Sequence, residues 1–321
     1  MRVLLVKLSS MGDVLHNLPV VSDLARAYPE IEIDWVTEAP YAPLVALHPR
    51  VRRVMSTNLR GLKKRWWSPA AWSAFFDTKA QLGREKYDRI LDTQGLIKSA
   101  LIARWANGPI GGFSRGTARE SLAARAYDRQ VAIPRNLHAV VRNRNLAAGI
   151  FGYALSGPAD YGLRLPETTI SADTHYVVFL HATSRADKMW PQAHWIALGQ
   201  RVRENGYAVF LPWGNDDEKR TSDRLAAAIP GAIVPSAMSL VAAATLLANA
   251  RGVIGVDTGL AHLSVALARP TVGLYITTSP GLTGLYGSDL AINMGGGTRP
   301  NPVVPDVDAV WQALQSLLSR Q

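Results

Sequence analysis

The sequence predicts an α/β protein with two domains, each built on a parallel β-sheet. Short apolar runs alternate along the chain with segments whose apolar residues recur at helical spacing. This alternation is typical of β-α-β units, in which helices cover a buried parallel sheet. Most of the apolar runs end in glycine or small polar residues, as expected where a ligand binds at the carboxyl ends of the strands. The chain has 321 residues, which is too long for one ordinary domain and sufficient for two.

The alternation defines the expected elements. Strands are predicted at Arg2–Leu8, Ile31–Val36, Val51–Met55, Tyr87–Thr93, Tyr176–Leu180, Ala208–Pro212, Ala232–Val234, Val253–Val256 and Thr271–Tyr275. Helices are predicted at Val14–Ala25, Pro40–Leu47, Gly95–Trp105, Arg119–Tyr127, Leu137–Phe151, His194–Glu204, Ser222–Ala228, Ser239–Ala250, Leu260–Ala268 and Val307–Leu318. Gly108–Gly116 is expected to be a glycine-rich loop.

The domain linker is placed at Gly157–Ile170, which carries proline and glycine with little periodicity. The domains are then 1–160 and 161–321. Two consecutive β/α arrays with polar strand ends predict two facing Rossmann-like domains with a ligand cleft between them. The sequence leaves open whether the terminal helix packs on its own domain or back on the first.

The clearest strand-to-helix junction is Gly252–Leu263. An apolar run stops at Asp257, and Thr258 and Gly259 open the apolar-periodic segment Leu260–Ala268. Free N–H groups at such a helix start suit a phosphate, and Asp257 could hydrogen-bond a polar ligand. Alternatively, Asp257 or Thr258 only caps the helix. The junction alone does not decide between these roles.

Positive charge is concentrated in the first half of the chain. The net charge is +10; residues 1–160 hold 23 Lys/Arg and 13 Asp/Glu, whereas residues 161–321 hold 12 of each. Such a field attracts a polyanion: a nucleic acid, an anionic membrane surface or a phosphorylated lipid.

The basic excess is densest in Ala39–Phe76, which contains no acidic residue. Within it, Leu59–Trp72 combines basic and aromatic side chains: Arg60, Lys63, Lys64, Arg65, Trp66, Trp67 and Trp72. This segment is either a solvated loop with tryptophans in the core, or a basic aromatic flap that contacts a membrane interface or an anionic substrate. We favour the flap because the acid-free window is long. No nucleic-acid-binding motif is present, so nucleic acid is not an expected partner.

Several protein classes are disfavoured. No apolar run reaches the ~18 residues that a membrane-spanning helix needs, and the N-terminus enters a strand without a signal-peptide pattern. The absence of cysteine excludes disulfides and thiolate metal sites and fits a reducing cytoplasm. Neither Gly-x-Gly-x-x-Gly nor a Walker motif occurs, which argues against a Rossmann dehydrogenase and a P-loop NTPase. No His-x-x-x-His pair or paired Asp cluster predicts a metal site.

Polar groups follow three strands of the second half and are expected to converge. They are Thr183, Ser184 and Lys188; Asp217 and Glu218; and Asp257, Thr258, Gly259 and His262. Hydroxyls, a lysine and a helix N-terminus suit a diphosphate, and a nearby acid could hold a ribose diol. A lysine can also neutralise a departing diphosphate without Mg²⁺.

In the first half, Asp13 is the only acid in the first βα turn, beside Ser9, Ser10 and Gly12. A lone carboxylate there could act as general base on an acceptor hydroxyl, a role that needs position and a modest upward pKa shift. Aspartate is also a good N-cap. Both roles can apply to one residue.

Three segments, in this order, closely resemble the lipopolysaccharide heptosyltransferases: Lys7–Pro19, His181–Pro191 and Val256–His262. Asp92–Lys98 and Thr117–Glu120 match as well, so the resemblance runs through nearly the whole chain. The first segment is most similar to heptosyltransferases of type I, which act on the Kdo-lipid A inner core.

The resemblance implies an inverting, metal-independent glycosyltransferase of the GT-B fold. The donor would be ADP-L-glycero-β-D-manno-heptose, held mainly by the second domain. The acceptor would be the Kdo sugar of Kdo₂-lipid A, held by the first. Asp13 would deprotonate the Kdo hydroxyl, and Lys188 would stabilise the leaving ADP. A cytoplasmic enzyme, peripheral on the cytoplasmic face of the inner membrane and monomeric, is expected.

Motif matching also implies binding residues. The donor site would be lined by Thr183, Ser184, Lys188, Asp257, Thr258, Gly259 and His262, with Glu218 near the ribose and Met238 against the adenine. The acceptor's carboxylates and phosphates would meet Ser10, Arg60, Lys63, Lys64 and Arg119. Ser184 stands where the family often has a second threonine, and a hydroxyl survives. Lys63 stands where arginine is common, which removes bidentate geometry.

Three alternatives stay open. A heptosyltransferase of type II, or a related member, would add heptose to an already heptosylated core. A GT-B-like sugar-nucleotide epimerase would need neither the basic flap nor the Asp13 turn. A peripheral membrane protein that binds a nucleotide sugar without catalysis would not need Asp13 together with Lys188.

Overall fold

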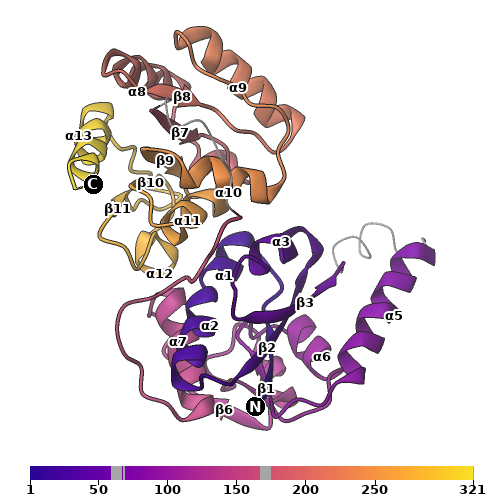
Figure 1. Ribbon diagram of the computed structural model, residues 1–321. Helices are drawn as coiled ribbons and strands as arrows, with labels where there is room; N and C mark the ends of the chain where they lie inside the picture. The colour runs from indigo at the N-terminus through magenta and orange to yellow at the C-terminus, as the bar shows by residue number, and fades with distance from the viewer. Residues whose placement is uncertain (59–66, 68, 167–174, 321) are drawn as a thin grey trace. The chain divides into compact units, whose positions relative to one another are not determined.

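The computed structural model describes residues 1–58, 67, 69–166 and 175–320. It divides into two compact units, Met1–Arg164 and Leu165–Gln321 (Figure 1). Each unit is a parallel sheet with helices packed on it and has its own hydrophobic core. Two Rossmann-like units with parallel sheets confirm the predicted α/β fold class.

The sheet of the first unit has six parallel strands in the order β3-β2-β1-β4-β5-β6. The strands are β1 (Arg2–Val6), β2 (Glu32–Glu38), β3 (Val51–Thr57), β4 (Arg89–Asp92), β5 (Ile110–Phe113) and β6 (Arg129–Val131). β2 and β3 lie on one side of β1, and β4, β5 and β6 lie on its other side. In open α/β sheets, the ligand crevice forms at the carboxyl ends of the strands at such a switch point.

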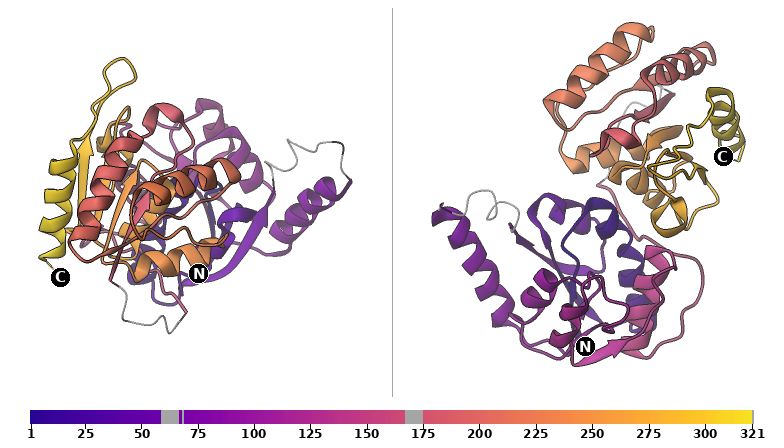
Figure 2. Two further views of the ribbon diagram at one scale, coloured as in Figure 1. Left: turned by 90° about the horizontal axis from the view of Figure 1, so that it is seen from above. Right: turned by 180° about the vertical axis from the view of Figure 1, so that it is seen from behind.

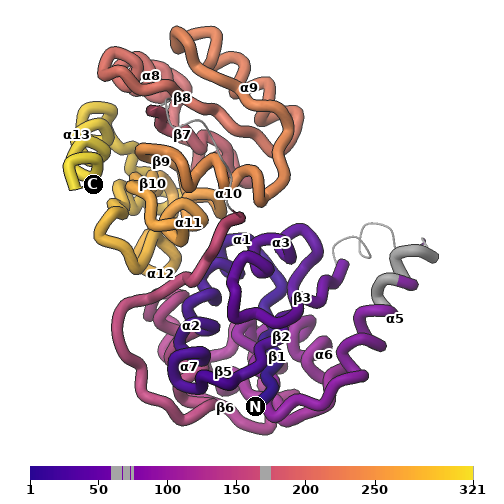
Figure 3. The backbone as a smooth tube through the Cα atoms, in the orientation of Figure 1, coloured from indigo at the N-terminus to yellow at the C-terminus, as the bar shows by residue number. Residues whose placement is uncertain are grey.

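Helices pack on this sheet, with α6 on β1 and β4 and α7 on β5 and β6, and α2 lies beside α7 (Figure 3). The helical elements are α1 (Met11–Leu15), α2 (Leu18–Ala27), η1 (Ala39–Tyr41), α3 (Ala42–Val45), α5 (Pro69–Arg84), α6 (Ile97–Ala103), η2 (Ser121–Ala126) and α7 (Ala139–Phe151). The single helix predicted over Val14–Ala25 is wrong, because α1 and α2 are separate. Pro19, the second residue of α2, lacks the N–H that a continuous helix would direct to Leu15.

The glycine-rich loop predicted at Gly108–Gly116 is also wrong, because this segment contains β5. Its two central glycines permit close packing rather than a turn. A Cβ on Gly111 would lie 2.8 Å from the side chain of Ile150, and one on Gly112 would lie 2.4 Å from the ring of Tyr127. The helix expected at Arg119–Tyr127 is the shorter 3₁₀ element η2.

The sheet of the second unit has five parallel strands in the order β11-β10-β9-β7-β8, with its switch point between β7 and β9. The strands are β7 (Tyr176–Leu180), β8 (Ala208–Phe210), β9 (Gly252–Val256), β10 (Thr271–Tyr275) and β11 (Ala291–Gly295). The helical elements are η3 (Ala186–Lys188), α8 (Gln192–Glu204), α9 (Asp216–Ala228), α10 (Leu240–Ala248), α11 (Gly259–Ala266), α12 (Pro280–Thr283) and α13 (Val307–Leu318). The strand predicted at Ala232–Val234 is only a single bridge between Ile233 and Phe210.

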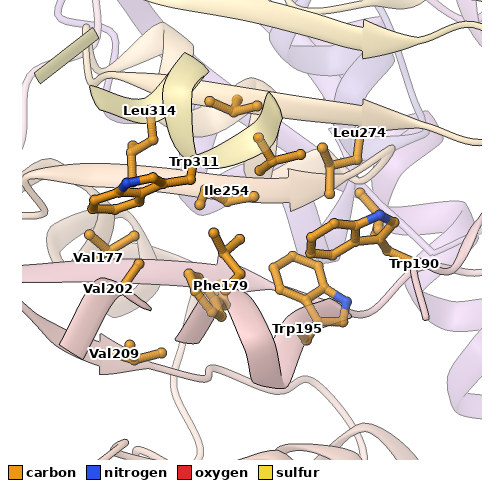
Figure 4. Close-up of a cluster of buried hydrophobic side chains, with 14 of the residues drawn as sticks. Val177, Phe179, Trp190, Trp195, Val202, Val209, Ile254, Leu274, Trp311 and Leu314 are labelled. Atoms are coloured by element: carbon orange, nitrogen blue, oxygen red, sulfur yellow. The ribbon is translucent and has the colours of Figure 1, made fainter. Parts of the chain in front are cut away.

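The core of the second unit is rich in aromatic rings. The ring of Trp195 lies 5.0 Å from those of Trp190 and Phe179, centroid to centroid (Figure 4). The indole N–H of Trp190 donates to the carbonyl of Pro305 at 2.9 Å. The terminal helix α13 packs beside α8 and on β9 and β10 (Figure 2), so it covers the second unit's own sheet.

Candidate functional site

Each unit carries a group of expected site residues at the switch point of its sheet. In the first unit, Asp13 lies in α1, directly after β1, and the next strand across the switch point is β4. In the second unit, Asp257 follows β9, and Thr183 follows the neighbouring strand β7.

In the first unit, Asp13 lies between a helix start and an arginine. Its Oδ2 atom accepts hydrogen bonds from the backbone N–H of Ser10 at 3.2 Å and from the Ser10 hydroxyl at 3.3 Å. Its Oδ1 atom accepts from Nη2 of Arg119 at 2.7 Å, across 106 residues of sequence. The structure thus brings together three residues expected from the sequence. Asp13 satisfies an N–H at the start of α1 and holds an ion pair at the same time.

The pKa of Asp13 moves in the direction opposite to the sequence expectation. Burial of the carboxyl raises its pKa, but the positive charges of Lys7 and Arg119 outweigh burial, and the pKa is lowered overall. Lys7 is buried, and its ammonium donates to the carbonyl of Thr93 at 2.9 Å. Burial lowers the pKa of Lys7 itself to about 8. The modest upward shift that the base role needs is therefore not found, because the charges of Lys7 and Arg119, whose closeness to Asp13 the sequence does not show, stabilise the carboxylate.

Two further guanidinium groups, those of Arg142 and Arg135, bind the backbone next to Arg119. Nη2 of Arg142 donates to the carbonyl of Thr117 at 2.9 Å, and its guanidinium carbon lies 4.7 Å from the centroid of the Phe113 ring. Arg135 donates to the carbonyl of Ala118. Burial lowers the pKa of Arg142, and the charges of Arg119 and Arg135 lower it further. This concentration of positive charge suits an anionic ligand beside Asp13.

Other expected acceptor residues lie outside the described part of the chain. These are Arg60, Lys63 and Lys64, and the same holds for Trp66 and for the side chain of Trp72. Trp67, which is described, has an exposed side chain.

In the second unit, Asp257 is the centre of a compact polar cluster. Its Oδ2 atom accepts from Nζ of Lys188 at 2.6 Å and from the Thr278 hydroxyl at 3.0 Å. Its backbone carbonyl accepts from the Thr183 hydroxyl at 3.0 Å. The structure thus brings together the expected Thr183, Lys188 and Asp257, and it adds Thr278 from the loop after β10.

Capping does not account for the side chains at the start of α11. Thr258 is the N-cap residue but makes no side-chain bond to the helix, and the carboxylate of Asp257 is bonded to Lys188 and Thr278. Gly259 is the first residue of α11, and His262 is buried within the helix. The N–H groups at this helix start therefore receive no bond from the Thr258 side chain, as an anion site requires.

The remaining expected donor residues lie at other strand and helix ends. The carboxylate of Glu218 accepts from the N–H of Gly214 and from the side-chain amide of Asn215, both at 2.8 Å, and so orders the loop after β8. Met238 is half-buried next to the N-cap residue of α10, and Ser184 is exposed in the loop after β7. The neighbouring Asp217 pairs instead with Arg220 on the surface of α9.

Within the described ranges, no three His, Cys, Asp or Glu side chains gather as a metal site. None of the helices in those ranges is both long enough and apolar enough to cross a membrane.

Comparisons with known proteins agree with the geometry. Residues 76–307 match the model of glycosyltransferase family 9 (heptosyltransferase). Lipopolysaccharide heptosyltransferase 1 of Pseudomonas aeruginosa is 44% identical over 89% of this chain and 82% of its own length. The enzyme of that name from Escherichia coli K12 is 40% identical over 99% of this chain and its full length. By contrast, lipopolysaccharide heptosyltransferase 2 of Salmonella typhimurium is 25% identical, over 88% of this chain and 85% of its own.

Solved structures give the same result. E. coli heptosyltransferase WaaC with ADP superimposes with a TM-score of 0.90 at 38% identity, over 99% of this chain and all of the other. The complex of WaaC with ADP-2-deoxy-2-fluoro heptose gives a TM-score of 0.88 at 37% identity, over 98% of this chain and 99% of the other.

Proposed function

Because this chain belongs to glycosyltransferase family 9, the heptosyltransferases, we propose that it transfers L-glycero-D-manno-heptose from ADP-heptose to the Kdo sugar of Kdo₂-lipid A. The observation that carries the proposal is the carboxylate Asp13 at the switch point of one sheet, with a lysine and a helix start that lacks a side-chain cap at that of the other. The identities favour type I over type II. The product is part of the lipopolysaccharide inner core.

Asp13 acts as the general base in this proposal. Its carboxylate takes the proton of a Kdo hydroxyl, and the hydroxyl oxygen attacks the anomeric carbon of heptose on the face opposite the diphosphate. The new C–O bond forms as the bond to the diphosphate breaks, and the configuration inverts. A carboxylate with a lowered pKa is a weak base. An acceptor anion that engages Arg119 removes a positive neighbour from Asp13, which raises the pKa of Asp13 when the substrate is in place.

Lys188 stabilises the leaving group. When the diphosphate binds, the ammonium of Lys188 exchanges its bond to Asp257 for one to a phosphate oxygen and neutralises the charge that develops on ADP. The hydroxyls of Thr183, Ser184 and Thr258 and the N–H groups from Gly259 onward bind the remaining oxygens. Glu218 binds the ribose, Met238 contacts the adenine, and His262 supports the site from within α11. Lysine and helix N–H groups supply the positive potential, so we propose that no metal is required.

The first domain (1–160) binds the acceptor and the second (161–321) binds the donor in this proposal. Ser10 and Arg119 contact the anionic groups of the acceptor, together with Arg60, Lys63 and Lys64. The net charge of +10, all of it in residues 1–160, supports an acceptor that carries carboxylates and phosphates. No nucleic acid takes part, and we propose that the enzyme is a monomer.

The test is an assay of ADP-heptose with purified Kdo₂-lipid A in the presence of EDTA, with the product identified by mass spectrometry. Addition of one heptose supports the proposal. Transfer only to an already heptosylated acceptor would assign the chain to type II. Failure with both acceptors would overturn the proposed reaction, and dependence on an added metal would overturn the metal-free mechanism.

The acceptor is a membrane lipid, so we propose that the enzyme binds the cytoplasmic face of the inner membrane peripherally. A suitable surface lies on α6 and η2, which pack against each other. Leu101 and Leu122 are 58% and 50% exposed, and Ile97 lies one helical turn before Leu101. The exposed Arg104 and Arg125 accompany them. Apolar side chains flanked by cations match an anionic lipid interface.

Replacing Leu101 and Leu122 by glutamate is expected to weaken binding to phosphatidylglycerol vesicles by about tenfold or more, because apolar contact is lost and negative charge is added. Co-sedimentation measures the binding. The matched control is Leu282→Glu in α12 of the second unit, where a leucine is 47% exposed. Equal binding by the double variant and the control would place the membrane surface elsewhere.

A further inference from the structure

The loop Asp92–Leu96, between β4 and α6, contacts the segment that leads to Asp13. Gln94 in this loop is 2% exposed. Its Oε1 atom accepts from the backbone N–H groups of Leu8 at 2.7 Å and Ser9 at 3.4 Å, and its Nε2 atom donates to the Ser9 carbonyl at 2.7 Å. Leu8 and Ser9 lie in the segment that connects the end of β1 to Asp13. One buried amide therefore fixes the path from the strand to the proposed base.

Gln94 is itself held by a carboxylate. Asp92 is fully buried, and its Oδ1 atom accepts from the N–H groups of Gln94 at 2.8 Å and Gly95 at 3.2 Å. Its Oδ2 atom accepts from the hydroxyls of Ser99 and Tyr127, both at 2.8 Å. Four donors from the loop, α6 and the residue after η2 thus converge on one side chain. Through Asp92, the backbone of Gln94 is therefore held in a fixed position relative to α6 and to the residue after η2.

The same loop also holds the other partner of Asp13. The carbonyl of Gly95 accepts from the N–H of Glu120 at 2.9 Å, and the carboxylate of Glu120 accepts from the N–H of Ile97 at 2.6 Å. A Cβ on Gly95 would lie 3.3 Å from the N atom of Arg119, and its φ of +67° favours glycine. The loop therefore aligns both the Asp13 segment and the Arg119 segment.

We propose that Gln94 is a positioning residue that sets the place of the Asp13 carboxylate opposite Arg119 and the acceptor hydroxyl. This inference rests on the proposed function, in which Asp13 is the base. Glutamine offers both an acceptor for the two N–H groups and a donor for the carbonyl, at every pH. A protonated glutamate would reproduce these bonds, an ionised glutamate would direct an oxygen at the Ser9 carbonyl, and leucine would leave all three backbone groups without a partner.

The experiment compares Gln94→Leu and Gln94→Glu with wild type and with a matched control, Gln130→Leu. Gln130 also donates through Nε2 to a backbone carbonyl, that of Ala124, but is exposed. Gln94→Leu is expected to lower kcat by about 100-fold, because a small misplacement of a reacting group costs that much. The KM for ADP-heptose is expected to stay within about twofold, since Gln94 lies outside the proposed donor site. The control should match wild type.

Gln94→Glu adds a second readout. Its protonated carboxyl reproduces the bonds of glutamine and its ionised form does not, so kcat should be near that of wild type at low pH and fall as this carboxyl ionises at higher pH. A third readout is non-additivity: in an Asp13→Asn background, Gln94→Leu should lower the residual kcat by less than about threefold, because the group that it positions no longer takes a proton. Loss of stability alone would produce neither this loss of kcat on ionisation of the carboxyl nor the non-additivity.

The outcomes separate this inference from the proposed function. Absence of transfer by wild type, or full activity of Asp13→Asn, would overturn the proposed reaction or its base. Transfer by wild type that Asp13→Asn abolishes, together with folded Gln94 variants of normal kcat and pH profile, would overturn the positioning role alone. If Gln94→Leu does not fold, as judged by circular dichroism, Gln94→Glu decides the matter: a kcat that equals that of wild type at a pH where infrared spectroscopy shows the introduced carboxyl ionised rejects the inference.

Discussion

Asp13→Asn is expected to lower kcat for heptose transfer by about 10³-fold, within the range by which a positioned general base accelerates a reaction. The amide keeps an oxygen for the N–H of Ser10 but cannot take a proton. The dissociation constant for ADP should change by less than about twofold, because Lys188 and Asp257 belong to the other unit. Steady-state kinetics and calorimetry measure the two quantities.

The pH dependence gives a sharper test of the same residue. The pKa of Asp13 is lowered in the free enzyme, so the wild-type carboxylate stays ionised as the pH falls below neutrality, and kcat/KM decreases only near that lowered pKa. This limb should be absent from Asp13→Asn. A suitable control is Asp128→Asn, because Asp128 also accepts from a backbone N–H, that of Ile110 at 2.8 Å. More than about a tenth of wild-type kcat in Asp13→Asn would contradict the assignment of the base.

Lys188→Met is expected to lower kcat by about 10²–10³-fold, the usual effect of removing one group that stabilises a developing charge. It should also weaken ADP binding, for two reasons. The diphosphate loses a cation, and the carboxylate of Asp257 keeps its charge without the ammonium that lies 2.6 Å away. The exposed Lys79 in α5 provides a control substitution, Lys79→Met, that should change neither quantity.

A double variant separates the two effects. Lys188→Met combined with Asp257→Asn removes the uncompensated carboxylate, so part of the ADP affinity should return. The value of kcat should not recover, because no group then stabilises the leaving diphosphate. Recovery of kcat in the double variant would show that Lys188 serves only to neutralise Asp257.

Much of the fold follows from local patterns. The boundaries of β7, β10 and α13 coincide with the predicted segments, because each is an uninterrupted apolar run or a clear helical repeat between polar residues. β5 is predicted as a loop rather than a strand, for a physical reason. Its glycines are required by the side chains of Ile150 and Tyr127, which lie far along the chain and cannot be inferred from the segment itself.

The same limit applies to the candidate site: residues in recognisable segments are predicted, whereas contacts between distant segments are not. Asp13, Arg119, Lys188 and Asp257 are all predicted as site residues, and the structure adds their pairing, Asp13 with Arg119 and Lys188 with Asp257. The ammonium of Lys7, the amide of Gln94 and the hydroxyl of Thr278 were not predicted as site groups. Their roles arise from contacts between distant segments, such as the 86 residues that separate Leu8 from Gln94. The available signals for Lys7 are its place at the end of a buried apolar run and at the start of the matched segment Lys7–Pro19, and for Gln94 its place in the matched segment Asp92–Lys98.

The ion pair between Lys188 and Asp257 has a consequence for ligand selectivity. Without a nucleotide, the centre of this cluster is electrically neutral, so an incoming anion must displace a carboxylate that is already bonded. Inorganic phosphate can replace the Asp257 carboxylate as the partner of Lys188 but makes few other contacts. Its binding is therefore only weakly favoured. In the proposed donor site, a nucleotide diphosphate makes further contacts through its ribose and base, which offset the displacement. The internal counter-ion is therefore expected to discriminate against small phosphate anions that compete for Lys188.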